Sequence, residues 1–430
     1  MTDIIDTLAE IEPGSSLDAI RSTRPQAKQN AQRSFNVLLE PSDPGTFPLV
    51  ERYAVAAYAA DLQAGGSVAS VFYAELLEDE ADTRLSESVA ALAGRDRVGG
   101  PYGQYREPRH AQESVPGRWA HYSSDRRDES ISGRLAAALE HTHLLTLHPR
   151  DARAEHLAAL EAAGWSADDI VTLSQLISFV AFQIRVVEGL RALADLPGAA
   201  VGAEGAAADD AADGGSAQRP AADTALPADS QVRLPGELAR PEGFTQEGLG
   251  WVPWLAPVPE AELSEAQREA LIDQFRIRSD YFRLLVRNPE ALEARTLTDK
   301  DIFYNMSTGL PRADREISAS AASRLNGCVY CASVHTMRAT KESGRYEDVQ
   351  KLLDEGVEAD LGEPWSAIAR ASAALTRTPS GFGPGEVKRL RQAGLDEADS
   401  VDVICGAAFF NWANRLMLSL GEPEVPARRR

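Results

Sequence analysis

The chain has 430 residues and contains 44 Lys and Arg against 65 Asp and Glu, which gives a formal net charge of −21. This length is enough for two or three domains with sizeable cores. The excess of acid argues against a broad nucleic-acid or anionic-membrane surface, because proteins bind phosphate groups through Lys and Arg. The three cysteines exclude a disulfide scaffold and are typical of a reducing compartment, so we expect a cytoplasmic protein.

The amino-terminal sequence MTDIIDTLAEIEPG is acidic and lacks a basic segment followed by an apolar core. We therefore expect no signal peptide. No uninterrupted apolar run approaches about 18 residues, so we expect no membrane span. Neither a membrane nor a nucleic acid is expected among the partners of this chain.

The first half of the chain is predicted to be helical, with one long interruption. Residues 51–72 form an Ala-rich block, and residues 173–193 have apolar side chains at the three- and four-residue spacing of a helix. Between them, residues 95–127 are rich in Gly, Pro, Arg and Tyr and have no helical pattern. This stretch is predicted to be a loop insertion.

A change of composition marks the middle of the chain. Residues 199–230 are mostly Ala, Asp and Gly, and Val201 and Leu226 are their only large apolar residues. Such a segment cannot bury enough surface to offset its ordering entropy, so we expect a flexible linker. The predicted organisation is a helical domain at 1–198, a disordered linker at 199–235 and a second helical domain at 236–430.

The second half is also predicted to be helical. Ser264, followed by Gln267, has the pattern of a capping box and predicts a helix over 264–287. Residues 314–325 and 399–420 repeat the helical period. We find no convincing run of alternating β-branched residues, so the sequence predicts an all-α fold.

Two segments of the first half recur in the second half, which indicates an internal repeat. Residues 51–72 resemble residues 316–337 at an offset of 265, whereas a later helix aligns at an offset of 230 and places Arg185 on Arg415. The difference of 35 residues implies an insertion in the first half, for which residues 95–127 are the candidate.

One constellation in the second half carries reactive side chains. Glu316, Cys328, Cys331 and His335 have the spacing E-x11-C-x2-C-x3-H. The last three are three and four residues apart, so on a helix their side chains share one face. The dipeptide Asn-Gly at 326–327 ends the preceding helix and supplies a start for the next.

These residue types suit thiol chemistry. The exposed N–H groups of a helix N-terminus stabilise a thiolate, which favours Cys328 as the thiol of lower pKa. His335 can exchange a proton with Cys331, one turn before it, and this favours Cys331 instead. Glu316 can orient the imidazole or relay a proton. Two neighbouring thiols also allow a sulfenic acid to resolve into a disulfide.

Three interpretations of this constellation compete. We favour a redox dithiol, because acid–base partners share its helix face. A zinc site would use both cysteines, His335 and Glu316, but structural zinc usually draws its ligands from two separated pairs, and this chain has one. The third interpretation is a pair of buried cysteines with only a structural role.

A downstream helix ends in Phe-Asn-Trp-Ala-Asn-Arg at 410–415. With this helix and the E-x11-C-x2-C-x3-H spacing, residues 275–421 resemble the AhpD-like alkylhydroperoxidases of the carboxymuconolactone decarboxylase superfamily. The whole chain resembles the fused, two-domain, peroxidase-related members. The resemblance implies two tandem all-helical domains, a homo-oligomer, and reduction of a hydroperoxide by a dithiol that an external reductant recycles. We expect neither a cofactor nor a metal.

The resemblance also implies roles for individual residues. Cys331 would be the peroxidatic thiol and Cys328 the resolving thiol, with Glu316 and His335 as the proton relay. The family suggests a lipoyl-bearing or thioredoxin-like dithiol as the reductant. Some members have a histidine just before the second cysteine, where this chain has Tyr330, so one proton-relay group of those members is missing.

The first half lacks the reactive side chains of the second. Glu51 aligns with Glu316, but Gln63 and Gly66 fall at the cysteine positions and Ser70 at the histidine position. This half therefore cannot perform dithiol chemistry, and we predict that it is a structural partner. Two alternative functions remain open for the chain, a lyase of the carboxymuconolactone decarboxylase type and a non-catalytic, redox-responsive assembly protein.

Several histidines lie outside this constellation. His141, His143 and His148 form an H-x-H-x4-H cluster, for which we favour a partly exposed helix end over a metal site. His110 and His121 lie in the predicted insertion, where we favour a solvated loop over a cover for a pocket.

The remaining notable residues are predicted to be structural. Cys405 lies in an apolar helical run and is expected to be a buried thiol. Trp251 and Trp254 lie in a Pro-rich segment and are expected to pack as anchors rather than line a substrate channel. Arg415 is expected to satisfy helix C-terminal carbonyls rather than hold a carboxylate. Residues 428–430 are predicted to be a disordered tail.

Overall fold

The computed structural model describes residues 3–122, 128–195 and 226–427. This part of the chain is mostly helical, which confirms the predicted all-α fold class. Most of the predicted linker, residues 196–225, and the predicted tail at 428–430 lie outside the described residues.

The first half, up to residue 195, forms two 3-10 helices and nine α-helices. They are α1 (Ile4–Leu8), α2 (Ser16–Ser22), α3 (Pro25–Leu39), α4 (Leu49–Ala64), α5 (Val68–Glu80), α6 (Thr83–Asp96), η1 (Pro108–Glu113), α7 (Gly133–Leu147), η2 (Pro149–Asp151), α8 (Ala154–Ala162) and α9 (Ala167–Ala194) among the described residues.

The second half, from residue 226, adds a two-stranded sheet to its helices. Its described elements are β1 (Gly250–Pro253), η3 (Glu260–Glu262), α10 (Glu265–Ala270), η4 (Gln274–Arg278), α11 (Asp280–Leu285), α12 (Pro289–Tyr304), α13 (Arg312–Asn326), α14 (Val329–Ser343), α15 (Tyr346–Glu355), α16 (Trp365–Thr376), α17 (Pro384–Gln392), α18 (Glu397–Leu420) and β2 (Gly421–Glu424).

Helices α9 and α18 form the centre of the molecule. The side chain of Ser166 caps α9 by accepting from Asp169 N at 3.1 Å, and Asp396 caps α18 by accepting from Asp399 N at 2.9 Å. Both helices are long and apolar enough to cross a membrane, with mean hydropathies of 1.8 and 1.2. Their apolar windows are 100% and 89% buried inside the fold, which is the arrangement of core helices.

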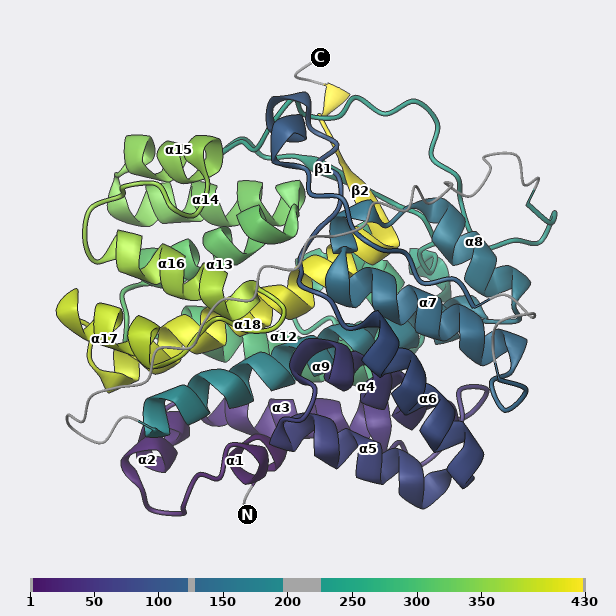
Figure 1. Cartoon of the computed structure of the whole chain (residues 1–430). Helices are drawn as coiled ribbons and strands as arrows, with labels where there is room; N and C mark the ends of the chain where they lie inside the picture. The colour runs from purple at the N-terminus through teal and green to yellow at the C-terminus, as the bar shows by residue number, and fades with distance from the viewer. Residues whose placement is uncertain (1–2, 123–127, 196–225, 428–430) are drawn as a thin grey trace.

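Equivalent helices have equivalent neighbours in the two halves of the chain. In the first half, α4 packs against α5, α7 and α9, and in the second half α13 packs against α14, α16 and α18. The halves meet where α9 packs on α18 and α3 packs on α12, with α4–α8 to one side and α13–α17 to the other (Figure 1). The domain boundaries stay a prediction. At the end of the predicted linker, Val232 is buried and forms a β-bridge with Leu255, so this residue packs against the second half.

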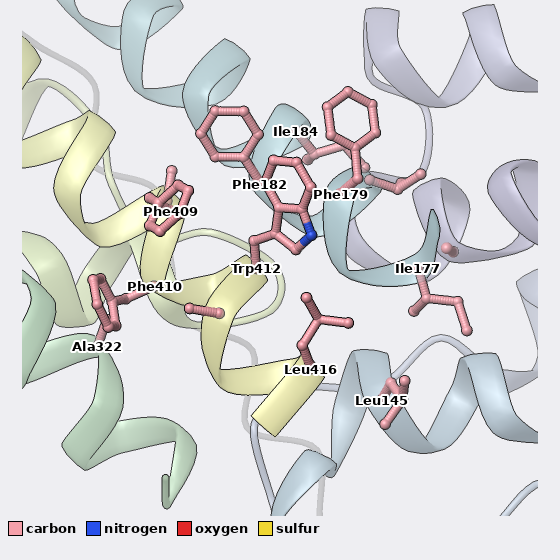
Figure 2. Packing of buried hydrophobic residues seen from close by; sticks show 14 of the residues in the cluster. Leu145, Ile177, Phe179, Phe182, Ile184, Ala322, Phe409, Phe410, Trp412 and Leu416 are labelled. Atoms are coloured by element: carbon pink, nitrogen blue, oxygen red, sulfur yellow. The ribbon is translucent and has the colours of Figure 1, made fainter. Parts of the chain in front are cut away.

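An aromatic cluster joins the central helices. Phe179 and Phe182 of α9 contact Trp412 of α18, with ring centroids 5.2 and 5.5 Å apart. In Figure 2, Trp412 is directed toward α9, whereas Phe410 on the other side of α18 is directed toward Ala322 of α13. Helix α18 therefore holds the first half with one face and the helix pair α13–α14 with the other.

Two local predictions differ from the structure. The capping box of Ser264 and Gln267 is present, but the helix predicted over 264–287 breaks into α10, η4 and α11. The interruption lies at Ile272, whose φ of 63° is incompatible with a right-handed helix. The small sheet also differs from the prediction, because β1 and β2 are short and their pairing joins segments some 170 residues apart.

Candidate active site

A tight turn between α13 and α14 positions the two cysteines. Gly327 ends α13 with a left-handed φ of 79°, and Cys328 is the N-cap residue of α14. The positive φ favours glycine, and a Cβ atom at Gly327 would also crowd Arg150, because it would lie 3.0 Å from the Cβ of that residue. The predicted break at 326–327 is thus where the structure has it.

The two thiols are in direct contact. Sγ of Cys328 donates to Sγ of Cys331 at 2.8 Å, and the two residues are 1% and 5% exposed. Burial raises the pKa of the Cys328 thiol well above its ordinary value, and the hydrogen bond to Cys331 adds to the rise. Of the two opposing arguments from the sequence, the one from the helix terminus does not hold at Cys328, because desolvation outweighs the dipole.

A buried carboxylate holds the histidine. Nδ1 of His335 lies 2.5 Å from Oε2 of Glu316, which is fully buried, and Arg312 pairs with the other oxygen of the same carboxylate. Burial acts to raise the pKa of Glu316, but His335 and Arg312 outweigh it and hold that pKa below its usual value. Because an ionised carboxylate only accepts, Nδ1 of His335 is the donor and a neutral imidazole keeps Nε2 as an acceptor.

The side chain of His335 lies between the buried carboxylate and an aromatic wall. Its ring is 4.1 Å from the ring of Phe410 between centroids, and its side chain is 18% exposed. Cys331 precedes it by one turn of α14, on the same helix face. The four residues predicted from the spacing are therefore brought together by α13 and α14, and their catalytic roles stay a prediction.

Buried amides fix the end of α13 to α18. Nδ2 of Asn326 donates to Oδ1 of Asn414 at 3.0 Å, and Nδ2 of Asn414 donates to Oγ of Ser323 at 3.0 Å. Asn414 also hydrogen-bonds Cys328, which acts to lower the pKa of that thiol. Arg415 donates to the carbonyl of Asn411, inside α18, and to that of Thr146, in the last turn of α7. It therefore satisfies a helix-end carbonyl as predicted, but that of another helix, because α18 continues beyond Arg415 to Leu420.

The first half contributes to this site. The hydroxyl of Tyr105 donates to the carbonyl of Arg324 at 3.2 Å, and Arg150 donates to the carbonyl of Leu325 at 2.7 Å. The guanidinium of Arg150 also lies 4.1 Å from the centre of the Tyr105 ring. Two residues of the first half therefore cover the carbonyls that immediately precede the dithiol turn.

The predicted insertion also packs against α13. His110 is 3% exposed and bonds both Glu113, at 2.7 Å, and Arg324, at 3.1 Å. Arg324 pairs in turn with Glu113 at 2.7 Å. The prediction of a solvated loop is therefore wrong for this part of the insertion, because His110 and Glu113 bond Arg324 of α13.

A narrow cavity of about 20 Å³ lies beside Cys328. Tyr330, Trp251 and Trp254 line it together with Tyr105 of the first half. Trp254 is buried and donates to Glu422 at 3.1 Å, and Trp251 donates to the carbonyl of Met417 at 3.2 Å. The two tryptophans are packed anchors, as predicted, and they also line this small cavity.

Two further polar residues near the site were not predicted. Asp299 of α12 interacts electrostatically with His335 and Glu316, and burial raises the pKa of its carboxyl. The hydroxyl of Tyr281 is buried without a hydrogen-bond partner among the described residues, and burial raises its pKa to about 12. Neither residue has a sequence spacing that relates it to the cysteines, so only the packing of α11 and α12 reveals them.

The aligned positions of the first half carry no comparable arrangement. Glu51 pairs with Arg134 at 3.1 Å instead of a histidine, and Gln63 accepts from Arg185 at 2.5 Å. The hydroxyl of Ser70 accepts from the backbone N–H of Gly66 at 2.9 Å. These side chains serve local structure, which agrees with a half that lacks dithiol chemistry.

The other singled-out residues do not line the cavity beside Cys328. Cys405 is only partly buried as a residue, and burial of its thiol raises the pKa to about 12. The prediction of a partly exposed helix end is wrong, because His141, His143 and His148 are all buried. Within residues 3–122, 128–195 and 226–427, no three His, Cys, Asp or Glu side chains converge in a way that could hold a metal ion.

Comparisons with known proteins concern the part of the chain that holds this site. The sequence model of the Carboxymuconolactone decarboxylase family matches residues 289–376, which span α12 to α16 and include both cysteines, His335 and Glu316. The uncharacterized protein YdfG of Bacillus subtilis (strain 168) is 29% identical over 119 residues, which are 27% of this chain and 80% of YdfG.

Proposed function

We propose, from the premise that residues 289–376 form a domain of the carboxymuconolactone decarboxylase family, that the chain is a dithiol-dependent peroxidase of the AhpD-like kind. Its substrate would be a hydroperoxide, and Cys328 and Cys331 would be the redox pair. The observation that carries the proposal is the direct contact of the two thiols beside a histidine that a buried carboxylate orients.

Cys331 would be the peroxidatic thiol. Cys328 is the poorer nucleophile, because burial raises its pKa and because its S–H already donates to Cys331. Nε2 of His335, one turn beyond Cys331, is an acceptor that can take the proton of the Cys331 thiol. Glu316 stabilises the imidazolium that results.

The reaction would proceed in balanced steps. The Cys331 thiolate attacks the terminal oxygen of the hydroperoxide, the O–O bond breaks, and the leaving alkoxide takes a proton from His335, so that an alcohol and a sulfenic acid form. Cys328 then attacks the sulfur of Cys331 and releases water, which leaves a disulfide between residues 328 and 331. An external dithiol reduces this disulfide and is itself oxidised.

The limited access to the two thiols favours a reductant whose dithiol can enter a narrow opening. Both thiols are nearly buried, and the cavity beside Cys328 holds about 20 Å³. A lipoyl group on a flexible arm needs less of an opening than the surface of a thioredoxin-like protein. We therefore propose a lipoyl dithiol as the electron donor, with the thioredoxin-like donor as the alternative to be tested beside it.

The test is consumption of tert-butyl hydroperoxide by the purified protein with dihydrolipoamide as the reductant. We expect turnover in the unchanged chain and in Cys405→Ser, the matched control, and no turnover in Cys331→Ser. Activity that survives when both Cys328 and Cys331 are replaced by serine would overturn the proposal and leave a decarboxylase-type lyase open. Fast disulfide formation without turnover would also overturn it, in favour of a redox-responsive assembly protein.

A further inference from the structure

The first half contains a cavity of about 380 Å³, far larger than the space beside Cys328. It lies between α7, α8 and the segment at 119–121. We call it the histidine cavity because five histidines contribute to its wall, namely His121, His141, His143, His148 and His156. It belongs to the half without cysteines, and the dithiol mechanism does not use it.

Much of the wall of the histidine cavity is apolar. Ala137, Leu144 and Leu160 line it, and so does the indole of Trp119. The indole stacks on His156, with centroids 5.7 Å apart and an interplanar angle of 25°, and meets His148 edge-on at 4.4 Å. A cavity with this wall suits a ligand that has a flat, apolar body.

A chain of hydrogen bonds sets the tautomers of two of the histidines. Nδ1 of His148 lies 3.2 Å from Oδ2 of Asp151, and the hydrogen bond from His148 helps to hold the pKa of Asp151 below its usual value although burial opposes it. The carboxylate is therefore ionised and accepts, so His148 donates through Nδ1 and accepts through Nε2. Nδ1 of His143 lies 3.2 Å from that Nε2 and must donate to it. Nε2 of His143 is left as a hydrogen-bond acceptor.

His156 offers a hydrogen-bond donor, whereas His143 offers an acceptor. Its Nδ1 accepts from the backbone N–H of Arg153 at 3.0 Å, so a neutral ring carries its proton on Nε2. That Nε2 is buried and has no hydrogen-bond partner among the described residues. Nδ1 of His141, which is 3% exposed, is likewise buried without a partner there. Buried polar atoms of this kind cost stability unless something binds them.

The cavity does not attract anions. Burial lowers the pKa of His141 and His143 to about 3 and that of His156 to about 4, so the three rings are neutral at pH 7. Glu140 also lines the cavity, and burial raises the pKa of its carboxyl, so the surroundings of this part of the wall disfavour a negative charge. The wall therefore favours a ligand without negative charge.

We propose that the histidine cavity binds a small, neutral, hydroxylated aromatic molecule, whose polar groups donate to Nε2 of His143 and accept from Nε2 of His156. The ring of the ligand would pack on Trp119 and the apolar side of α7. This binding site is independent of the dithiol, so it gives the first half a role of its own beside that of a structural partner.

The proposal can be tested with a matched pair of probes, 2-naphthol and its anionic counterpart 2-naphthoate, titrated into the full-length protein at pH 7 by calorimetry. We expect saturable binding of 2-naphthol, and binding of 2-naphthoate at least about 10-fold weaker because the buried wall disfavours a negative charge. Equal affinity for the two probes, or no saturable binding of 2-naphthol, would overturn the proposal.

Two variants locate the binding. His143→Phe keeps the volume of the wall but removes the acceptor, and we expect it to weaken 2-naphthol binding about 10-fold. Ala159→Trp adds a large side chain at an exposed position of α8 that lines the cavity, and it should block binding without removing a buried group. Cys328→Ser is the control and should bind as the unchanged chain does. If Ala159→Trp folds and still binds 2-naphthol with full affinity, the histidine cavity is not the site.

Discussion

Arg185 and Arg415 each bind the end of a helix in the opposite half of the molecule. Arg185 donates to the carbonyl of Thr376 at 3.0 Å, and Arg415 donates to the carbonyl of Thr146 at 3.1 Å. Donors and acceptors are both related by the offset of 230 residues that the sequence repeat shows. The two halves thus exchange one equivalent hydrogen bond, and each half completes a helix end of the other.

Replacing either arginine should lower the free energy of unfolding of the protein. In Arg415→Gln, the buried carbonyl of Thr146 loses its donor, so we expect the free energy of unfolding to fall by about 1–3 kcal/mol. Arg185→Gln should cost a similar amount, because its contact is equivalent. Urea unfolding measures both. The control is Arg389→Gln, whose side chain is 54% exposed and which should change stability by less than about 0.5 kcal/mol. A loss in Arg415→Gln no larger than in this control would contradict the role of the exchanged hydrogen bonds.

The pair of Glu316 and His335 should set the reactivity of the dithiol. His335→Gln removes the proton acceptor, so we expect the rate of hydroperoxide reduction to fall by about 10²- to 10⁴-fold. Glu316→Gln should lower the rate less, because the imidazole remains but its imidazolium loses the carboxylate. The pH dependence of iodoacetamide alkylation, followed by mass spectrometry of Cys331, checks the cause. An unchanged alkylation profile in His335→Gln would show that the histidine does not act on this thiol.

The buried histidines of the first half should make the fold sensitive to mild acid. Because burial lowers the folded-state pKa of His141 to about 3, the unfolded chain binds a proton below about pH 6.5 while the folded chain does not. Stability is therefore fully present above that pH and falls as the pH drops from 6.5 toward 3, by up to about 1.4 kcal/mol per pH unit for this one residue.

Urea unfolding between pH 7 and pH 5 measures this slope. We expect His141→Gln to make it shallower. Leu144→Ala, on the wall of the same cavity, should lower the free energy of unfolding by about 2–5 kcal/mol at every pH and leave the slope unchanged. Equal slopes in His141→Gln and the unchanged chain would mean that this histidine is protonated in the folded state.

The first half should control access to the thiols. Tyr105 binds the carbonyl before the dithiol turn and lines the cavity beside Cys328, so Tyr105→Ala opens a path to that sulfur. In a Cys405→Ser background, we expect the variant to react faster than the parent with a bulky disulfide reagent, followed by the absorbance of the released thiolate. The change Tyr346→Ala, at an exposed position of α15, is the control. Equal rates for Tyr105→Ala and the parent would place the access path elsewhere.

Local patterns account for the parts of the site that could be predicted. The spacing of Cys328, Cys331 and His335 follows from the geometry of one helix, and Asn-Gly at 326–327 marks where that helix begins. The pairing of Glu316 with His335 could be anticipated because both lie on helices joined by this turn. Contacts within one supersecondary unit leave a regular spacing in the sequence, which is why they can be inferred without a structure.

The rest of the site depends on contacts that leave no such spacing. The opposing effects on the pKa of Cys328 cannot be weighed from the sequence, because a helix N-terminus is visible there, whereas the side chains that bury the thiol are not. His156 and Trp119 complete the histidine cavity from separate segments, and the sequence cluster of His141, His143 and His148 gave no sign of either. The desolvation of a group depends on every element packed around it, so burial and pKa are properties of the tertiary fold.

The sequence by itself determined the helical class, the internal repeat and the half that holds the pair of cysteines, because composition, helical period and the identity of a side chain are local facts. Only the tertiary structure decided that Tyr105 and Arg150 of the cysteine-free half cover the dithiol turn, and that the same half encloses a cavity. These features depend on contacts between residues that are far apart in the chain. Such contacts form because α9 packs on α18, and no single segment of sequence specifies them.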